Sequence, residues 1–67
     1  MDIEQMKDEL AELRRKQFNK SALLSYNVEH GTDEQVREWG KKYLQATIDV
    51  MDAENRLQKA VTEASWS

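Results

Sequence analysis

Few side chains in this sequence could carry out covalent or acid–base chemistry. His30 is the only histidine and the 67 residues include no cysteine, so the chain offers neither a thiol nucleophile nor a pair of histidine ligands. His30 stands where its cation would favour the C-terminal end of a helix. The carboxylate pairs Asp8–Glu12 and Asp49–Asp52 are expected to be solvated, and there is no glycine-rich phosphate loop. We therefore predict that the chain is not an enzyme and has no catalytic, metal-binding or cofactor-binding residues.

Basic side chains are concentrated in the middle of the chain. Residues 14–48 carry seven basic and four acidic side chains, whereas the other residues carry three basic and nine acidic ones. A chain that folds back on itself would gather the central basic residues into a girdle at mid-height, where they could bind phosphate groups. The residues of this basic girdle are Arg14, Arg15, Lys16, Lys20, Lys41 and Lys42.

The alternative for these charges is a set of solvated helix faces held by intrahelical ion pairs. Such pairs stabilise a helix by only about 0.2–0.5 kcal/mol each. The pairs predicted from spacing are Glu12–Lys16, Asp33–Arg37, Glu38–Lys42 and Asp52–Arg56. The net charge of −3 also argues against a general nucleic-acid binder, although a local basic patch remains compatible with it.

The elements that must position these residues are helices. Proline is absent, glycine occurs twice, and 34% of the residues are Asp, Glu, Lys or Arg, which is typical of long uninterrupted helices. We predict an all-α fold with one domain over residues 1–67, an antiparallel hairpin with helices over 2–29 and 33–64 and a turn at 30–32.

The turn is predicted from a single break in the helical pattern, His30-Gly31-Thr32. Gly31 is expected to take the left-handed conformation that ends a helix. Thr32 is expected to cap the second helix, and Gln35, three residues later, completes a capping box.

Both predicted helices have an apolar seam with alternating spacings of three and four residues. In the second helix the seam is Val36, Trp39, Tyr43, Ala46, Val50, Ala53, Leu57, Ala60 and Ala64. In the first helix it is Ile3, Met6, Leu10, Leu13, Gln17, Ser21, Leu24 and Val28. Antiparallel pairing about Gly31 places Leu10 opposite Ala53 and Leu13 opposite Val50. The Tyr43 hydroxyl would need a partner in this seam, and Gln17 or Ser21 lies at a suitable height.

Each helix also carries a second apolar stripe, which a two-helix hairpin alone would leave in water. The simplest arrangement that buries these stripes is a symmetric dimer of hairpins, a four-helix bundle, with Gly40 as a point of close approach between helices. The candidate interface residues are Phe18, Ala22, Tyr26, Gly40, Leu44, Thr47, Ile48 and Met51.

The size of the chain favours the same prediction. A domain of 67 residues hides only about 60% of the surface that its unfolded form exposes, and small domains are often stabilised by disulfides, metals or association. Without cysteine, association is the means that remains. Residues 1–9 contain no apolar run of signal-peptide length, and no segment approaches the about 20 apolar residues that span a bilayer. We predict a cytoplasmic protein without membrane association.

In its size, its lack of cysteine and its acidic, all-helical character, the chain resembles the small accessory proteins of temperate-bacteriophage early regions. This resemblance implies a regulator of a host factor in the host cytoplasm. The sequence thus predicts an oligomeric, non-catalytic hairpin that binds and modulates another protein, through exposed apolar residues such as Leu23 or Trp66. Two alternatives stay open, a nucleotide- or nucleic-acid-binding protein that uses the basic girdle, and a structural assembly factor.

Overall fold

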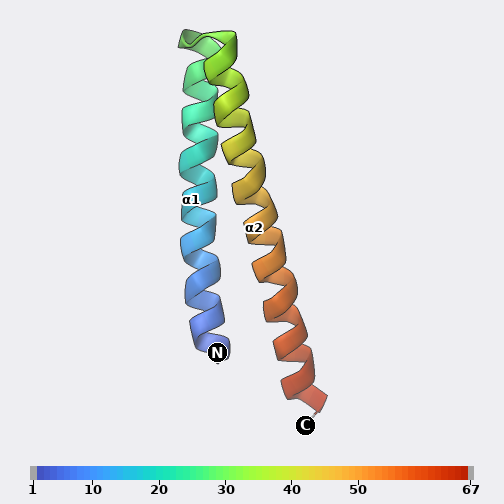
Figure 1. Ribbon diagram of the computed structural model, residues 1–67. Coiled ribbons are helices and arrows are strands. Elements are labelled where there is room, and N and C mark those ends of the chain that lie inside the picture. Colours follow the sequence, from blue (N-terminus) through green and yellow to red (C-terminus); the bar gives the residue numbers. More distant parts are fainter. Residues whose placement is uncertain (1, 67) are drawn as a thin grey trace.

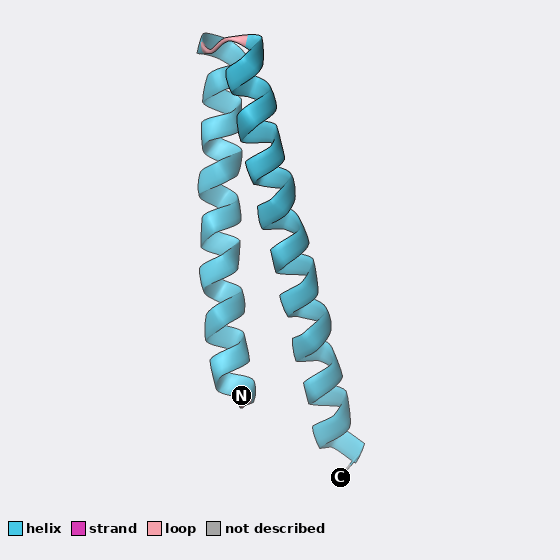
Figure 2. Cartoon of the chain, viewed as in Figure 1, coloured by secondary structure: helices cyan, strands magenta, loops and turns pink. Residues whose placement is uncertain are grey.

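The computed structural model describes residues 2–66, which form two antiparallel helices joined by a short turn (Figures 1 and 2). Helix α1 spans Ile3–His30 and helix α2 spans Asp33–Trp66, and residues 2–66 contain no strand. The predicted all-α hairpin is therefore confirmed. Neither helix combines the length and the apolar character needed to cross a membrane, as far as residues 2–66 are concerned.

The hairpin is a rod rather than a compact domain. Its extents are 53 × 14 × 14 Å and its radius of gyration is 15.4 Å, whereas a compact domain of this length has a radius of gyration of about 11 Å. The last residues of α2, 61–66, are all exposed, and this end of α2 extends beyond the start of α1 (Figure 1). Most side chains of the rod therefore remain in contact with solvent.

Both helices begin with a capping box. At α2, Gln35 N donates to Thr32 Oγ1 at 3.2 Å and Thr32 N donates to Gln35 Oε1 at 2.9 Å, as predicted. At α1, Gln5 N donates to Asp2 Oδ1 at 2.7 Å and Asp2 N donates to Gln5 Oε1 at 3.2 Å. Each box pairs two N–H groups that the helix start would otherwise leave unbonded.

Gly31 follows α1, but its conformation is not the left-handed one that we predicted. Its φ is −97° and its ψ is −179°, an extended backbone that any residue adopts. A Cβ at this position would lie 2.9 Å from the Asn27 carbonyl oxygen, 2.7 Å from Asn27 Oδ1 and 2.9 Å from Gln35 Oε1. The prediction is wrong because the turn requires a residue without a side chain for space, not for backbone conformation.

The centre of the seam matches the predicted pairing. Leu10, Val50 and Ala53 form the buried core cluster, and Leu13 and Leu57 pack against it. No side chain among residues 2–66 is completely buried, and even Leu10 and Val50 keep 6% of their surface exposed. The seam is therefore correctly in register but narrow.

The seam of α1 departs from the prediction near the turn. Val28 is 63% exposed, whereas its neighbour Asn27 is buried. The seam follows a strict seven-residue repeat through Leu13, Lys20 and Asn27. Asn27 is tolerated there because its Nδ2 donates to the Leu23 carbonyl at 2.7 Å. The prediction for Val28 is wrong because it followed the apolar side chain of Val28, whereas the seven-residue repeat places Asn27 in the seam.

A polar contact joins the helices at the middle of the seam. Gln17 Nε2 donates to Thr47 Oγ1 at 3.0 Å, and Thr47 Oγ1 donates to the Tyr43 carbonyl at 3.0 Å. The Gln17 amide thus bonds to Thr47 and not to the Tyr43 hydroxyl, for which we predicted it. Because Gln17 and Thr47 are partly buried, this bond helps to fix the register of the two helices.

Replacing Gly31 by alanine should lower the free energy of unfolding by about 1–3 kcal/mol, because the added methyl group overpacks the turn. Gly31→Asn should be at least as destabilising, although asparagine is tolerated where a glycine is left-handed. Urea unfolding of both variants at one protein concentration measures these changes. A Gly31→Asn variant as stable as the wild type would contradict the crowding at this turn.

Candidate functional site

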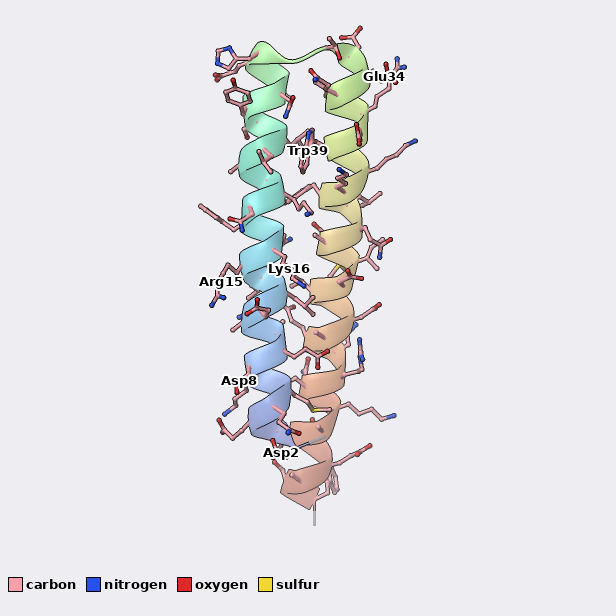
Figure 3. The ribbon with its side chains drawn as sticks, turned by 60° about the vertical axis from the view of Figure 1, so that its left-hand side comes forward. Asp2, Asp8, Arg15, Lys16, Glu34 and Trp39 are labelled. Carbon is pink, nitrogen blue, oxygen red and sulfur yellow. The ribbon has the colours of Figure 1, made fainter. Side chains whose placement is uncertain are left out.

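The basic girdle divides over two sides of the hairpin. Lys16, Lys20 and Lys42 line one groove of about 280 Å³, whereas Arg14 lines another of about 490 Å³, and the two grooves share no residue. Side chains two positions apart on a helix point about 200° apart, so Arg14 and Lys16 face different sides. Figure 3 shows Arg15 pointing away from α2 and Lys16 lying toward it. The six predicted residues therefore do not form one site.

The smaller groove holds three of the six basic side chains. We call it the lysine groove, and its lining residues are Leu13, Lys16, Lys20, Lys42, Gln45, Ala46 and Asp49. Three ammonium groups and one carboxylate give this lining a positive charge on a chain that is negative overall. Lys16 and Lys20 make no ion pair with any of residues 2–66, so both charges are available to an external anion.

Trp39 lies beside the lysine groove and orders two of its lysines. Lys42 Nζ lies 4.3 Å from the centre of the indole ring and Lys20 Nζ lies 5.9 Å from it. Both distances are within the range of cation–π attraction, and Trp39 extends from α2 toward α1 (Figure 3). Lys42 also pairs with Glu38 at 3.4 Å. Lys20 is half-buried because its stem can lie on the ring while its charge reaches water.

The two arginines of the girdle are already paired. Arg14 Nη2 lies 2.8 Å from Glu54 Oε1, which joins α1 to α2, and Arg15 Nη1 lies 3.0 Å from Glu12 Oε2. Lys41 is exposed and lines neither of these grooves. The part of the predicted girdle that remains suited to an anion is thus the set of three lysines.

The intrahelical ion pairs differ in part from those we predicted. Glu38–Lys42 is present. Glu12 pairs with Arg15 and not with Lys16, and Arg56 Nε donates to the Asp52 carbonyl at 3.4 Å rather than to its carboxylate. No ion pair between Asp33 and Arg37 occurs within the described chain, residues 2–66. Of the four predicted ion pairs, only Glu38–Lys42 therefore occurs among residues 2–66.

The larger groove brings the two second stripes together. From α1 it is lined by Arg14, Gln17, Phe18 and Ser21, and from α2 by Tyr43, Thr47, Val50, Met51 and Glu54. Phe18 is 72% exposed and Met51 is 56% exposed, although each flanks the same groove. Phe18 of the α1 stripe and Thr47 and Met51 of the α2 stripe thus lie on one side of the hairpin.

This side continues along α2 toward the turn. Leu44 lies seven residues before Met51, Gly40 lies seven residues before Thr47, and seven residues are close to two helical turns. Leu44 is 59% exposed, and a Cβ on Gly40 would meet no atom within 4 Å. The apolar face, as we call it, consists of these uncharged residues: Phe18, Ser21, Gly40, Leu44, Thr47 and Met51.

Two of the other predicted interface residues, Ala22 and Ile48, border this face. Ala22 follows Phe18 by four residues and Ile48 follows Leu44 by four, so each is the next side chain around its helix. Ala22, Ile48 and Tyr26 are exposed. The Tyr26 ring lies 4.8 Å from the ring of His30, which occupies the last turn of α1.

His30, the only histidine of the chain, lies at the end of α1. His30 lies 3.7 Å from the Glu29 carboxylate, and both side chains are exposed. No group of three His, Asp or Glu side chains in residues 2–66 could together hold a metal ion. What the surface does offer is one apolar face and one cationic groove.

No family model, curated protein or solved structure matches this chain.

The Arg14–Glu54 pair provides a test of the helix register. Reversing either charge alone should lower the free energy of unfolding by about 0.5–1 kcal/mol, a small effect because both side chains are about half exposed. The double variant Arg14→Glu/Glu54→Arg should recover most of this loss. Urea unfolding of the four proteins at one concentration and low salt measures the coupling, and no recovery in the double variant would contradict the contact.

Proposed function

We propose that this chain is a non-catalytic binding protein whose working form is a dimer of hairpins, a four-helix bundle that contacts another protein. The observation that carries the proposal is that Phe18 of α1 and Met51 of α2 flank one groove while each stays largely exposed. Large apolar side chains gathered on one side of a small protein are typical of an interaction surface.

The exposed area of the hairpin supports self-association. The chain exposes 5387 Å², whereas a compact monomer of 7.9 kDa would expose about 4,400 Å². The excess of about 1,000 Å² is similar to the about 800 Å² that each partner buries in a standard protein interface. A second copy of the rod, laid along the apolar face, would bury an area of this size.

The composition of the apolar face supports the same occupant. Between Arg14–Glu54 at one end and Arg37 at the other, its residues carry no charge, although 34% of the chain is charged. Burying one Leu, Met or Phe side chain contributes about 1.5–3 kcal/mol, and a twofold interface uses each residue twice. The face is therefore suited to contact with an identical face.

Two exposed leucines provide a matched test of self-association. Leu44 lies on the apolar face, whereas Leu23 lies seven residues after Lys16 and so on the side of the lysine groove. Leu44→Asp should convert the dimer to a monomer and lower its helix content, because a carboxylate cannot be buried there unpaired. Leu23→Asp makes the same chemical change and should leave the dimer intact.

Sedimentation equilibrium and circular dichroism at micromolar concentration measure both outcomes. A wild-type chain that is a fully helical monomer of about 8 kDa under these conditions would overturn the dimer. Equal loss of association in the two variants would show that Leu44 has no special position.

The partner protein is proposed to bind on the outward side that the dimer leaves free. There Leu23 is 41% exposed on the side of α1 that also carries Lys16, and exposed apolar and basic side chains on one side fit an acidic segment with apolar residues. This proposal includes the role that the phage resemblance implies, regulation of a host factor. A structural role in a larger assembly would use the same outward surface.

A second candidate function is the binding of a phosphate-bearing ligand in the lysine groove. The observation that favours it is that Lys16 and Lys20 of α1 and Lys42 of α2 line the same groove. Lys42 pairs with Glu38, whereas Lys16 and Lys20 have no carboxylate partner among residues 2–66. Phosphate oxygens are strong acceptors for such ammonium groups. The groove volume of about 280 Å³ suits a small phosphate ester rather than a long polymer.

The triple variant Lys16→Gln/Lys20→Gln/Lys42→Gln tests this candidate. It should lose retention on a heparin or phosphate column. The control Lys7→Gln/Lys41→Gln/Lys59→Gln should keep it, because none of its three lysines lines the lysine groove. Both variants remove three positive charges, so their net charges are equal. Circular dichroism checks that helix content is unchanged. Wild-type protein that passes through at about 50 mM salt would exclude phosphate binding, since such binding is strongest at low salt.

A further inference from the structure

We infer that the second copy lies antiparallel on the apolar face, with α1 on α1, α2 on α2 and the two turns at opposite ends of the bundle. This inference rests on the self-association proposed above and adds its orientation. The arguments come from the distribution of charge along the rod, from the space beside Gly40 and from the unpaired Arg37.

Two identical faces can meet about a twofold axis in two ways. If the axis runs along the rod, both turns lie at one end and α1 faces the other copy's α2. If the axis runs across both helices, the turns lie at opposite ends and each helix faces its own equivalent. Both arrangements bury the apolar face, so apolar area alone does not choose between them.

The charge along the rod favours the antiparallel arrangement. Residues 14–48, the half that contains the turn, carry seven basic and four acidic side chains, whereas the open end carries three basic and nine acidic ones. Neighbouring helices in a bundle lie about 8–10 Å apart, which is comparable with the Debye length of about 8 Å at physiological ionic strength. Parallel copies would bring together two open ends that each have a net charge of −6, whereas antiparallel copies would set each open end against residues 23–41 of the other copy, which carry two basic and four acidic side chains.

The middle of the apolar face fixes the position of the axis. Phe18 lies at the centre of the uncharged stretch, and in an antiparallel pair it would meet its own copy. In α2, residues whose numbers sum to about 90 then lie at the same height, because each helix rises about 1.5 Å per residue. Gly40 therefore stands at the height of the partner's Met51. A Cβ on Gly40 would meet no atom of its own hairpin within 4 Å, which leaves room for the methionine side chain.

The same register gives Arg37 a partner. Arg37 lines a groove with Val28, Asp33 and Val36 near the turn and makes no ion pair within residues 2–66. In the antiparallel dimer it stands at the height of the partner's Glu54, whose carboxylate would then bind Arg37 as well as the Arg14 of its own hairpin. Parallel copies would instead set α2 against the partner's α1, where the residue at the height of Arg37 is the partner's Tyr26.

Distances between spin labels distinguish the two orientations directly. The chain has no cysteine, so Thr62→Cys and Asn19→Cys each introduce one labelling site at an exposed position. Thr62 lies about 17 residues from the axis position in α2, so antiparallel copies place two labels about 50 Å apart and parallel copies place them within about 25 Å. Asn19 lies near the axis, and its labels should be within about 30 Å in either orientation, which makes it the control for pairing.

Double electron–electron resonance on the labelled dimers is expected to give the long Thr62 distance together with the short Asn19 distance. A short Thr62 distance in a protein of dimer mass would overturn the antiparallel orientation and leave self-association standing. A monomer mass with no dipolar signal at either site would overturn self-association itself. Gly40→Leu, which fills the space opposite the partner's Met51, should raise the dimer dissociation constant at least tenfold, whereas Gln45→Leu on the outward side should not.

Discussion

The narrow seam between α1 and α2 is the constraint on which the rest of this structure depends. The apolar residues it buries are Leu10, Ala46, Val50 and Ala53, and two of these are alanines. Small side chains let two helices approach closely, but they remove little apolar area from water. Helical stability in proteins comes mostly from packing of this kind. This narrow seam is the reason for our proposal that a further contact stabilises the rod.

The capping boxes and polar contacts give the hairpin its shape rather than most of its stability. Asp2 and Thr32 define where the helices begin, and Gln17 with Thr47 fixes how the helices align. Each such hydrogen bond contributes about 0.5–1.5 kcal/mol net. These bonds order the backbone, but they do not offset the conformational entropy that the backbone loses on folding. The large apolar side chains that could supply more, Phe18 and Met51, lie outside the seam.

One side of the hairpin is apolar and the other is basic, because side chains seven residues apart lie on the same side of a helix. On one side Phe18, Leu44 and Met51 are exposed without a charge between them. On the other side Lys16, Lys20 and Lys42 surround a groove next to Trp39. An association through the first side would leave the second side outward on both copies. The proposed self-association and the proposed ligand binding would therefore use different residues.

Composition and periodicity predicted the hairpin, the turn and the α2 seam as far as Ala60, because each follows from local rules of spacing and capping; the predicted seam residue Ala64 is exposed. They failed at Gly31, where the requirement is steric and depends on atoms of Asn27 and Gln35 that only the fold brings together. They also failed at Val28, because the polar neighbour Asn27 occupies the seam in its place.

The candidate sites were only partly predictable. The sequence identified the basic residues but not their division over two sides, which depends on how α1 and α2 are rotated about their axes. The same rotation brings the stripes of Phe18 and Met51 to one groove, although neither stripe alone indicates its side. A signal was available in the seven-residue spacing of Arg14 and Ser21, which places both on one flank of the seam. The Asp2–Gln5 capping box could likewise have been found from its spacing.

The central claim is that this hairpin is stable only when its apolar face is covered by a second copy. Thermal unfolding followed by circular dichroism over a hundredfold range of protein concentration tests it most directly, because a folded dimer and an unfolded monomer are linked by mass action. The melting temperature is predicted to rise steadily with concentration. A melting temperature that stays constant over this range, with a cooperative transition, would contradict the claim and show that the narrow seam is sufficient.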